Sequence, residues 1–193
     1  METTHGREDS EARLLTAAAS GELTAFESLY RLYETRVYRY VLTLVDDQTT
    51  AEDVTGETMI AVWRGAGGYT RRSRVSTWIF GIARHKALDA LRRLGRRHRD
   101  VDLETAADIP SPHETPLDDV HRKQVERAMQ SALAALSPDH REVLRLVFYE
   151  ELPYDEIGSL LSIPANTVKT RVFYAKQQLK RHLERLGQKE PIS

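Results

Sequence analysis

The segment from residue 154 to residue 183 constrains the fold of this chain more than any other. It holds two short runs of helical periodicity, separated by Ser162, Ile163 and Pro164. Apolar residues in both runs are spaced so that two crossing helices share one small core, with Gly158 at their closest approach. This pattern predicts a helix-turn-helix, a motif whose second helix enters the major groove of DNA.

The second of these helices has two faces of opposite character when its residues are placed about 100° apart. Val168, Val172, Ala175 and Leu179 fall on the inner face, so we expect them in the core. The outer face is polar, aromatic and cationic, a composition that suits base edges and phosphates. We expect the DNA-binding residues here to be Asn166, Thr167, Lys169, Thr170, Arg171, Phe173, Tyr174 and Lys176.

The net charge of −1 conceals a strong segregation of charge along the 193 residues. Residues 64–99 carry 11 basic side chains and 1 acidic one, and residues 165–189 carry 7 and 1. Residues 100–120, between these blocks, carry 7 acidic side chains and no basic one. The two basic blocks predict two separate contacts with nucleic acid, joined by an acidic connector that can mask either block in the free chain.

Other features of the sequence exclude several classes of function. Cysteine is absent, which rules out disulfides and thiolate metal sites within the chain. The polar N-terminus is unlike a signal peptide, and no apolar run reaches the ~20 residues of a membrane helix, so we expect a cytoplasmic protein. The seven histidines lie on different predicted elements, without metal-ligand spacing. We therefore expect no metal, no cofactor and no enzymatic activity.

Every periodic segment of the chain is helical, so the predicted fold class is all-α. Capping boxes at 24–27 and 50–53 predict that two helices begin there. A long helix is expected from 77 to 94, ended by Gly95. Residues 97–119 hold three prolines and lose all periodicity, which is typical of a linker.

Helical periodicity returns near residue 120 and continues to residue 136. Ser137 and Pro138 then supply an N-cap and a proline at the first helical position of the next helix. The sequence thus predicts two small helical domains joined by a flexible acidic linker. The expected boundaries are an N-terminal tail at 1–21, a first domain at 22–96, the linker at 97–120, a second domain at 121–187 and a C-terminal tail at 188–193.

Trp78 is expected on the same helix face as several cations, next to an arginine-rich loop. Aromatic rings interleaved with arginines suit an unstacked, single-stranded base, which needs a ring to stack on and a cation for its phosphate. A tryptophan also commonly belongs to the core, and that alternative stays open for Trp78. The residues expected to bind DNA in this region are Arg71, Arg72, Arg74, Ser76, Trp78, Arg84, His85 and Lys86.

Asp53 and Glu57 form a stripe of like charge, because residues four apart are neighbours on a helix. The helix N-terminus stabilises Glu52 and Asp53 but does not reach Glu57, a full turn later. A partner protein that supplies cations would explain the stripe, and a merely solvated stripe is the alternative. Together with Ile60, these residues form the expected protein-binding surface.

Four segments, in this order, resemble an extracytoplasmic-function (ECF) sigma factor, of the sigma-70 family of bacterial RNA polymerase sigma subunits. Residues 25–44 resemble its opening helix, 50–64 its polymerase-binding helix and 76–93 its promoter-melting helix. Residues 132–180 resemble its C-terminal domain almost from end to end. Four motifs in the family's order are far more specific than any one of them.

The resemblance implies an alternative sigma factor that binds core RNA polymerase and directs promoter-specific initiation. Residues 22–96 would be sigma region 2, which binds the polymerase and captures and melts the minus-10 element. Residues 121–187 would be sigma region 4, which reads the minus-35 element of promoter DNA. The family also implies control by an anti-sigma factor. The alternative is a helix-turn-helix regulator that acts independently of core polymerase.

The chain departs from the family pattern at four positions. Gly56 stands where the family often has glutamine, within the polymerase-binding helix. Pro153 replaces the usual serine cap, so a backbone amide at the start of the helix-turn-helix needs another acceptor. Asn166 and Tyr174 occupy recognition-helix positions that the family often fills with glycine and arginine. The promoter preference of relatives therefore does not transfer to this chain.

Overall fold

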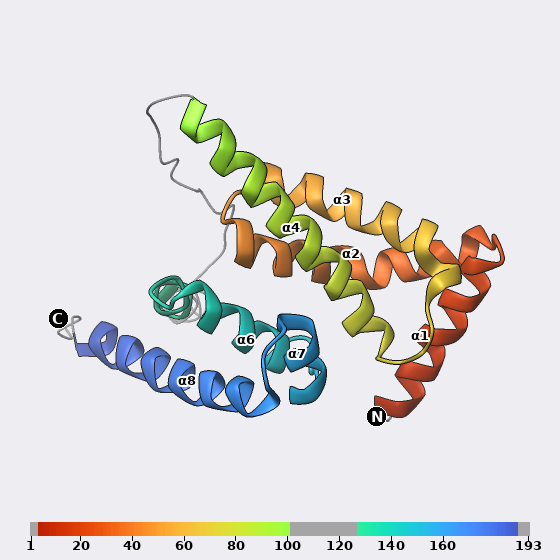
Figure 1. The fold of residues 1–193 in the computed structure, drawn as a ribbon. Coiled ribbons are helices and arrows are strands. Elements are labelled where there is room, and N and C mark those ends of the chain that lie inside the picture. Colours follow the sequence, from red (N-terminus) through yellow and green to blue (C-terminus); the bar gives the residue numbers. More distant parts are fainter. Residues whose placement is uncertain (1–3, 101–126, 189–193) are drawn as a thin grey trace, which may run out of the picture.

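The structure is a computed structural model that describes residues 4–100 and 127–188. Within these ranges every regular element is a helix and no strand is present, as Figure 1 shows. The predicted all-α fold class is therefore confirmed. Most of the expected linker, from residue 101 on, and the tail at 189–193 lie outside the described residues.

The N-terminal domain is built around three helices that pack on one another, α2, α3 and α4, with α1 lying across α2 (Figure 1). Its core is rich in aromatic rings, and Tyr33, Tyr40 and Phe80 are all fully buried. The edges of the Tyr33 and Tyr40 rings meet Phe80, with ring centroids 6.4 and 5.2 Å away. The elements are α1 (Thr4–Ala19), α2 (Leu23–Val45), α3 (Gln48–Gly65), the 3-10 turn η1 (Ala66–Gly68) and α4 (Val75–Asp100).

Helix α1 corrects the expectation of an N-terminal tail at 1–21, because residues 4–19 are part of the fold. Leu15 and Ala18 of this helix are buried against the domain core. Glu11 is also buried, and its carboxylate accepts a hydrogen bond of 2.6 Å from the Tyr33 hydroxyl. Burial raises the pKa of Tyr33, and the charge of Glu11 raises it further, so the phenol keeps its proton and remains the donor.

Neither predicted capping box forms. Helix α2 begins at Leu23, and the Thr24 hydroxyl donates to the Glu22 carboxylate at 3.1 Å instead of capping the helix. Helix α3 begins at Gln48, and Asp47 caps it by accepting from the backbone N–H of Thr50 at 2.7 Å. Hydrogen bonds from Thr50 lower the pKa of Asp47, as expected of a carboxylate that caps a helix in its charged form.

Helix α4 is longer than predicted at both ends, because it starts at Val75 and continues through Gly95 to Asp100. The glycine was expected to end the helix, but arginines follow it and arginine is a good helix former. Helix α3, in contrast, ends at Gly65, where the sequence predicts its end.

The C-terminal domain contains a helix over 127–134, followed by α6 (Pro138–Phe148), α7 (Tyr154–Leu161) and α8 (Ala165–Gln188). Ser137 caps α6 as predicted: its side chain accepts from the backbone N–H of His140, and Pro138 is the first helical residue. Pro153 precedes α7 without any side-chain cap, also as predicted. The two domains touch, since α6 packs on α2 and α7 packs on α4 (Figure 1).

The helix-turn-helix predicted at 154–183 is confirmed. Helix α7 ends at Leu161, the C-cap residue Ser162 has a φ of 58° in the left-handed region, and α8 begins at Ala165. A Cβ atom added at Gly158 would lie 2.7 Å from the carbonyl oxygen of Ile163. No side chain fits at that distance, so the two helices cross where the sequence predicts.

Gly158→Ala is expected to destabilise the chain by about 1–3 kcal/mol, because the methyl group would push the turn of the helix-turn-helix away from α7. Gly56→Ala is the matched control, since a Cβ at Gly56 would meet nothing within 4 Å. That second change is expected to stabilise the chain by about 0.5–1 kcal/mol through helix propensity alone. Urea unfolding followed by circular dichroism measures both effects, and equal shifts in the two variants would contradict the proposed crossing.

Candidate nucleic-acid interface

The inner face of α8 packs as the sequence predicts. Val168 and Ala175 are fully buried, and Val172 is nearly so. Leu179 is partly buried against the same core. Because the inner face is fixed in this way, the residues between these positions are held outward in one orientation.

Six of the eight residues expected to bind DNA on α8 are exposed, and Thr167 and Arg171 are half-buried. The Arg171 guanidinium pairs with Asp139 of α6 at 2.9 Å. The Lys176 ammonium lies over the ring of Phe148, 4.6 Å from its centroid. The exposed residues are Asn166, Lys169, Thr170, Phe173, Tyr174 and Lys176.

Phe173 and Tyr174 form an exposed aromatic pair on α8. Their ring centroids lie 5.5 Å apart, and each side chain is more than half exposed. The inner face of α8 is already packed against the core, so these two adjacent rings form an exposed apolar patch, and such patches mark interaction sites. Next to Lys169 and Thr170, they make a face that can contact thymine methyl groups, base edges and phosphates.

In the N-terminal domain, the loop before α4 is held by its own hydrogen bond. The Tyr69 hydroxyl donates to the carbonyl oxygen of Ser73 at 2.6 Å, and Arg71 within the loop has a φ of 57°. Burial raises the pKa of Tyr69, which keeps this donor protonated. Arg71 and Arg72 are exposed at the tip of the loop. Ser76, in contrast, is buried and offers little surface to DNA in this arrangement.

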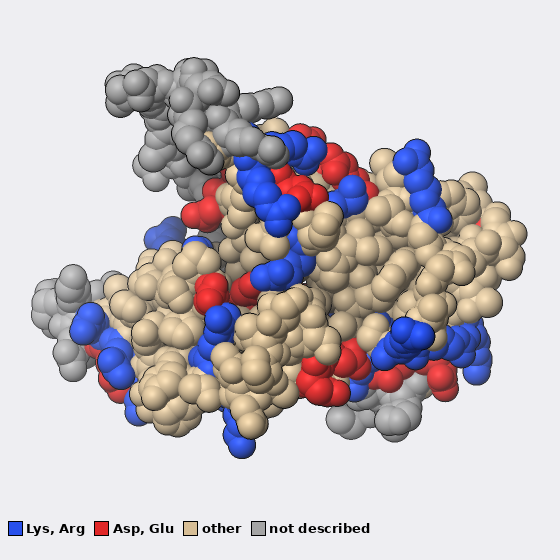
Figure 2. Space-filling view, in the orientation of Figure 1, with Lys and Arg blue, Asp and Glu red and all other residues tan. Residues whose placement is uncertain are grey.

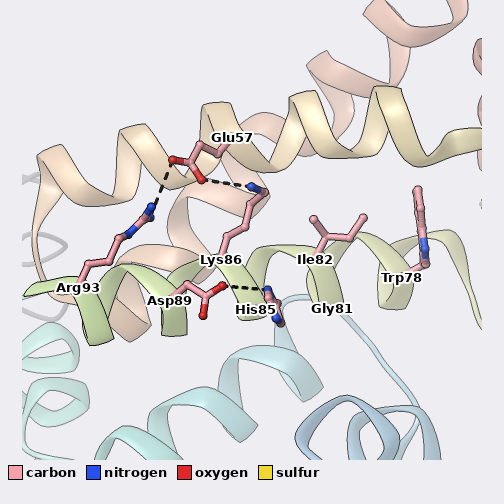
Figure 3. A pocket seen from close by; sticks show the side chains of 8 residues that line it. All are labelled: Glu57, Trp78, Gly81, Ile82, His85, Lys86, Asp89 and Arg93. Carbon is pink, nitrogen blue, oxygen red and sulfur yellow. Dashed lines mark hydrogen bonds and ion pairs between the residues drawn. The ribbon is translucent and has the colours of Figure 1, made fainter.

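Trp78 lies at one end of a groove of about 590 Å³ between α3 and α4, shown in Figure 3. The tryptophan is half-buried. Its ring packs against Tyr69, with the two ring centroids 5.5 Å apart, and lies close to Gly65. Trp78 also lines the groove. Trp78 is therefore partly a core residue, and its place in the groove leaves stacking of a base on its ring as a prediction. His85, Lys86 and Arg93 line the same groove.

Most of the cations expected to bind the minus-10 element have carboxylate partners within the chain. Arg74 pairs with Glu8 at 2.8 Å, Arg84 with Glu142 at 3.0 Å and Lys86 with Glu57 at 3.1 Å. His85 lies 3.2 Å from Asp89. On the face shown in Figure 2, basic and acidic side chains accordingly lie side by side.

The acidic stripe of α3 differs from its prediction at one residue. Glu52 and Asp53 are exposed, and Ile60 is 53% exposed, as a docking surface requires. Glu57, however, faces two cations of α4, Lys86 at 3.1 Å and Arg93 at 3.9 Å (Figure 3). Glu57 was predicted to meet cations of a partner protein, and in the structure this chain itself supplies cations to it.

Three acidic residues of the C-terminal domain contact the N-terminal domain and are not among the predicted site residues: Glu142, Glu150 and Glu156. Glu142 and Glu150 are buried. No sequence signal points to them, because a glutamate in a helix or turn is ordinarily solvated and its long-range partner depends on how the domains dock.

Two kinds of site are absent from the described residues. No three of their histidine and acidic side chains come together as a metal site. None of their helices is long and apolar enough to cross a membrane.

Comparison with known proteins agrees with this geometry. A model of sigma-70 region 2 matches residues 29–97, and a model of sigma-70 region 4 matches residues 132–181. The ECF RNA polymerase sigma factor SigL of Mycobacterium tuberculosis is 31% identical over 90% of this chain and 97% of its own length. RNA polymerase sigma-H factor of Pseudomonas aeruginosa is 27% identical over 93% of this chain and 96% of its own.

The ECF sigma factor SigE of Mycolicibacterium smegmatis is 32% identical over 83% of this chain, which spans 62% of that protein's length. Among solved structures, the sigma factor RpoE of Bartonella quintana, in complex with the anti-sigma factor NepR, has a TM-score of 0.67 at 24% identity. The match covers 84% of this chain and 98% of the RpoE chain. CnrH, in complex with the cytosolic domain of CnrY, has a TM-score of 0.64 at 20% identity. That match covers 91% of this chain and 97% of the CnrH chain.

The two solved structures show that the fold of this chain is a known one. The family resemblance drawn from the four motifs is confirmed by the two region models and by SigL. These matches favour a sigma factor over a regulator that works without polymerase, because a whole domain matches sigma region 2. The chain belongs to the extracytoplasmic-function family of RNA polymerase sigma factors.

Proposed function

We propose that this sigma factor binds core RNA polymerase through α3 and directs it to promoters through two DNA-binding surfaces. Region 4, residues 121–187, reads the minus-35 element as duplex through the outer face of α8. Region 2, residues 22–96, captures minus-10 bases through the loop before α4 and the Trp78 groove. The observation that carries this proposal is the outer face of α8, which is exposed and fixed by a buried inner face.

The α3 surface has the composition of a protein-docking site. Glu52 and Asp53 are exposed carboxylates, and Ile60, two turns from each of them, is an exposed apolar side chain. An apolar centre with charges at its edge is typical of specific interfaces. Gly56 lies between them with open space above its Cα, so a partner's side chains can approach the helix backbone there.

Asp53→Lys is expected to weaken binding of the chain to core polymerase by about tenfold or more, since close charge pairs at an interface contribute ~1.5–7 kcal/mol. Asp53 is preferred to Glu57 for this test, because changing Glu57 would also disturb Lys86 and Arg93. Glu27→Lys, an equal charge change on the exposed face of α2, is the control. Fluorescence anisotropy with labelled protein measures both affinities, and equal losses would place the docking surface elsewhere.

We further propose that the chain works in the cytoplasm, has no catalytic activity of its own and is held inactive by an anti-sigma factor. Phosphodiester bond formation would belong to the polymerase. Support for an anti-sigma partner comes from RpoE of Bartonella quintana, which shares the fold and was solved with the anti-sigma factor NepR. Purified chain with nucleotides and template, but without core enzyme, should give no transcript.

A further inference from the structure

A cavity of about 390 Å³ lies between the C-terminal end of α2, the helix over 127–134 and α6. None of the residues that line it belongs to the DNA-binding or polymerase-binding surfaces proposed above. Its volume falls within the ~300–1,000 Å³ of typical small-molecule sites and is too small for a helix of a partner protein. The cavity is therefore a candidate site for a small ligand.

One part of the cavity wall is apolar. It is formed by Leu42 of α2, Leu133 of the helix over 127–134 and Leu144 of α6. Leu144 is buried, Leu42 and Leu133 are half-buried, and all three belong to the hydrophobic core or pack against it. An apolar group placed on these leucines would leave water for a surface that the fold already holds in position.

The rest of the cavity wall is rich in cations. Arg39 of α2 and Arg141 and Arg145 of α6 line it, and Asp46 is the one acidic side chain among its described lining residues. Burial lowers the pKa of Arg145; Glu150 opposes this effect, and the charge of Arg39 lowers the pKa again. The arginines are thus held close together at an electrostatic cost that a bound anion would relieve.

Two nitrogen atoms of these arginines are buried without a hydrogen-bond partner among the described residues, Nε of Arg141 and Nε of Arg145. Folded proteins leave few buried donors unpaired, so each such atom calls for an acceptor. The Arg145 guanidinium is held in place by Glu150 at 3.2 Å and by the Tyr149 ring, whose centroid lies 4.7 Å away. An acceptor in the cavity would therefore meet a donor that is already oriented.

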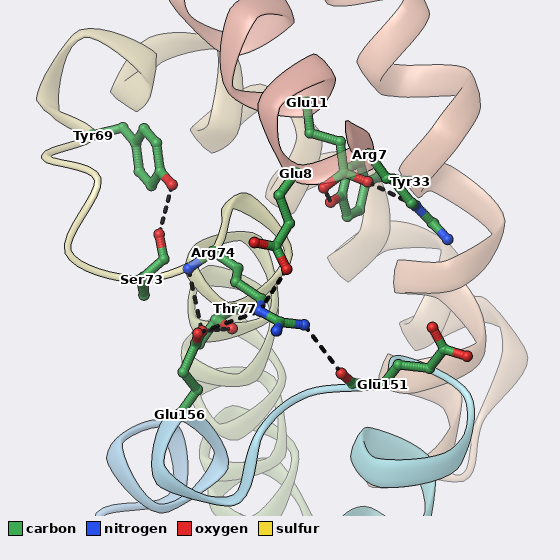
Figure 4. A network of polar contacts seen from close by, with 10 residues as sticks. All are labelled: Arg7, Glu8, Glu11, Tyr33, Tyr69, Ser73, Arg74, Thr77, Glu151 and Glu156. Atoms are coloured by element: carbon green, nitrogen blue, oxygen red, sulfur yellow. Dashed lines mark hydrogen bonds and ion pairs between the residues drawn. The ribbon is translucent and has the colours of Figure 1, made fainter. Parts of the chain in front are cut away.

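The contact between the domains around Arg74 differs in this respect, as Figure 4 shows. The Arg74 guanidinium lies 2.8 Å from Glu8 and 3.5 Å from Glu156, and it donates to the carbonyl oxygen of Glu151 at 3.3 Å. Acceptors within the chain thus satisfy that arginine. Arg141 forms no ion pair with the described residues, so the unpaired donors are a local property of the cavity.

We infer that the cavity binds a small amphipathic anion, with its carboxylate against Arg141 and Arg145 and its apolar chain on the three leucines. A carboxylate accepts two hydrogen bonds, and such bonds to a guanidinium are strong because both partners are charged. The ligand would touch α2 and α6 together, so its binding would stabilise the fold in which these helices are adjacent. The inference does not depend on the proposed function.

The test uses decanoate as the probe, with the full chain and below the micelle concentration, and isothermal titration calorimetry measures its Kd. Decanol has the same chain without the charge, and butyrate has the same charge with a much shorter chain. We expect decanoate to bind at one site and to raise the temperature of unfolding, and each of the other two to bind at least about tenfold more weakly. No binding of decanoate, or equal binding of decanoate and decanol, would overturn the inference.

Arg141→Met keeps an apolar stem and removes the charge. It is expected to weaken decanoate binding by about 10- to 150-fold, the effect of losing one charged hydrogen bond. Arg31→Met is the matched control, because Arg31 is exposed on α2 and does not line the cavity, and it should leave the Kd unchanged. An Arg141→Met chain that binds decanoate as tightly as the natural chain would overturn the inference.

Gln130→Glu keeps the test decisive if Arg141→Met does not fold. Gln130 is exposed and lines the cavity, so the change adds a carboxylate at the rim without disturbing the core. The new charge would repel decanoate and compete for the arginines, which should weaken binding by about tenfold. Gln177→Glu, an equal change at an exposed position of α8 that does not line the cavity, should have no effect. Equal affinities in these two variants would also overturn the inference.

Discussion

Lys169→Ala is expected to lower initiation at a promoter that needs its minus-35 element by about 5- to 150-fold. A side chain that reads a base edge or its phosphate in the major groove contributes ~1–3 kcal/mol to discrimination. Lys169 is exposed on the outer face of α8, so its truncation would remove the proposed DNA contact without opening the core. Run-off transcription with saturating core polymerase measures the effect.

Lys180→Ala is the matched control for this prediction. Lys180 lies on the same helix, is equally charged and has a partner 3.8 Å away in Glu184, one turn further along. It is well beyond the part of α8 that the helix-turn-helix presents to DNA, so its substitution should change initiation little. If both alanine variants lost the same activity, α8 would contribute only general charge and not recognition.

Trp78→Ala is expected to reduce initiation on an intact promoter by about 5- to 150-fold and to have little effect on a template that is already melted. Stacking of one base on an aromatic ring is worth ~1–3 kcal/mol, and this energy helps to hold the bubble open. The half-buried ring lines the groove between α3 and α4, where an unstacked base can reach it. The ratio of activities on the two templates isolates the melting step.

Trp63→Ala provides the control, because Trp63 is also half-buried and packs on Phe26 with ring centroids 4.8 Å apart, away from that groove. It should lose stability without a preference for the melted template. A Trp78→Ala chain that is unfolded at the assay temperature, or that is equally impaired on both templates, would assign Trp78 to the core alone.

Local chemistry explains which parts of the fold were predictable. Gly158, the turn at Ser162 and the Ser137 cap depend on neighbours within a few residues, and all three were confirmed. The capping box at 24–27 was wrong because α2 already begins at Leu23, which places Thr24 inside the helix, and the box at 50–53 was wrong because a competing acceptor lies just upstream. Asp47 precedes the second box and, in an extended backbone, reaches the N–H of Thr50.

The residues that sequence reasoning missed depend on contacts between distant segments. Glu11 is buried through Tyr33, which lies 22 residues away, and Glu142 through Tyr40, which lies 102 residues away. A hydropathy pattern classes such glutamates as solvated, because it contains no information about their partners. For the same reason Glu57 was assigned to a partner protein, although Lys86 of the adjacent helix already pairs with it.

The dependence of promoter recognition on core polymerase is decided by run-off transcription from genomic promoter fragments, with chain alone, core alone and both together. We expect discrete start sites only when both are present, and weak binding of promoter duplex by the chain alone. Tight binding of duplex DNA without core enzyme, together with no stimulation of initiation when core is added, would contradict a sigma factor and support a regulator that acts independently of polymerase.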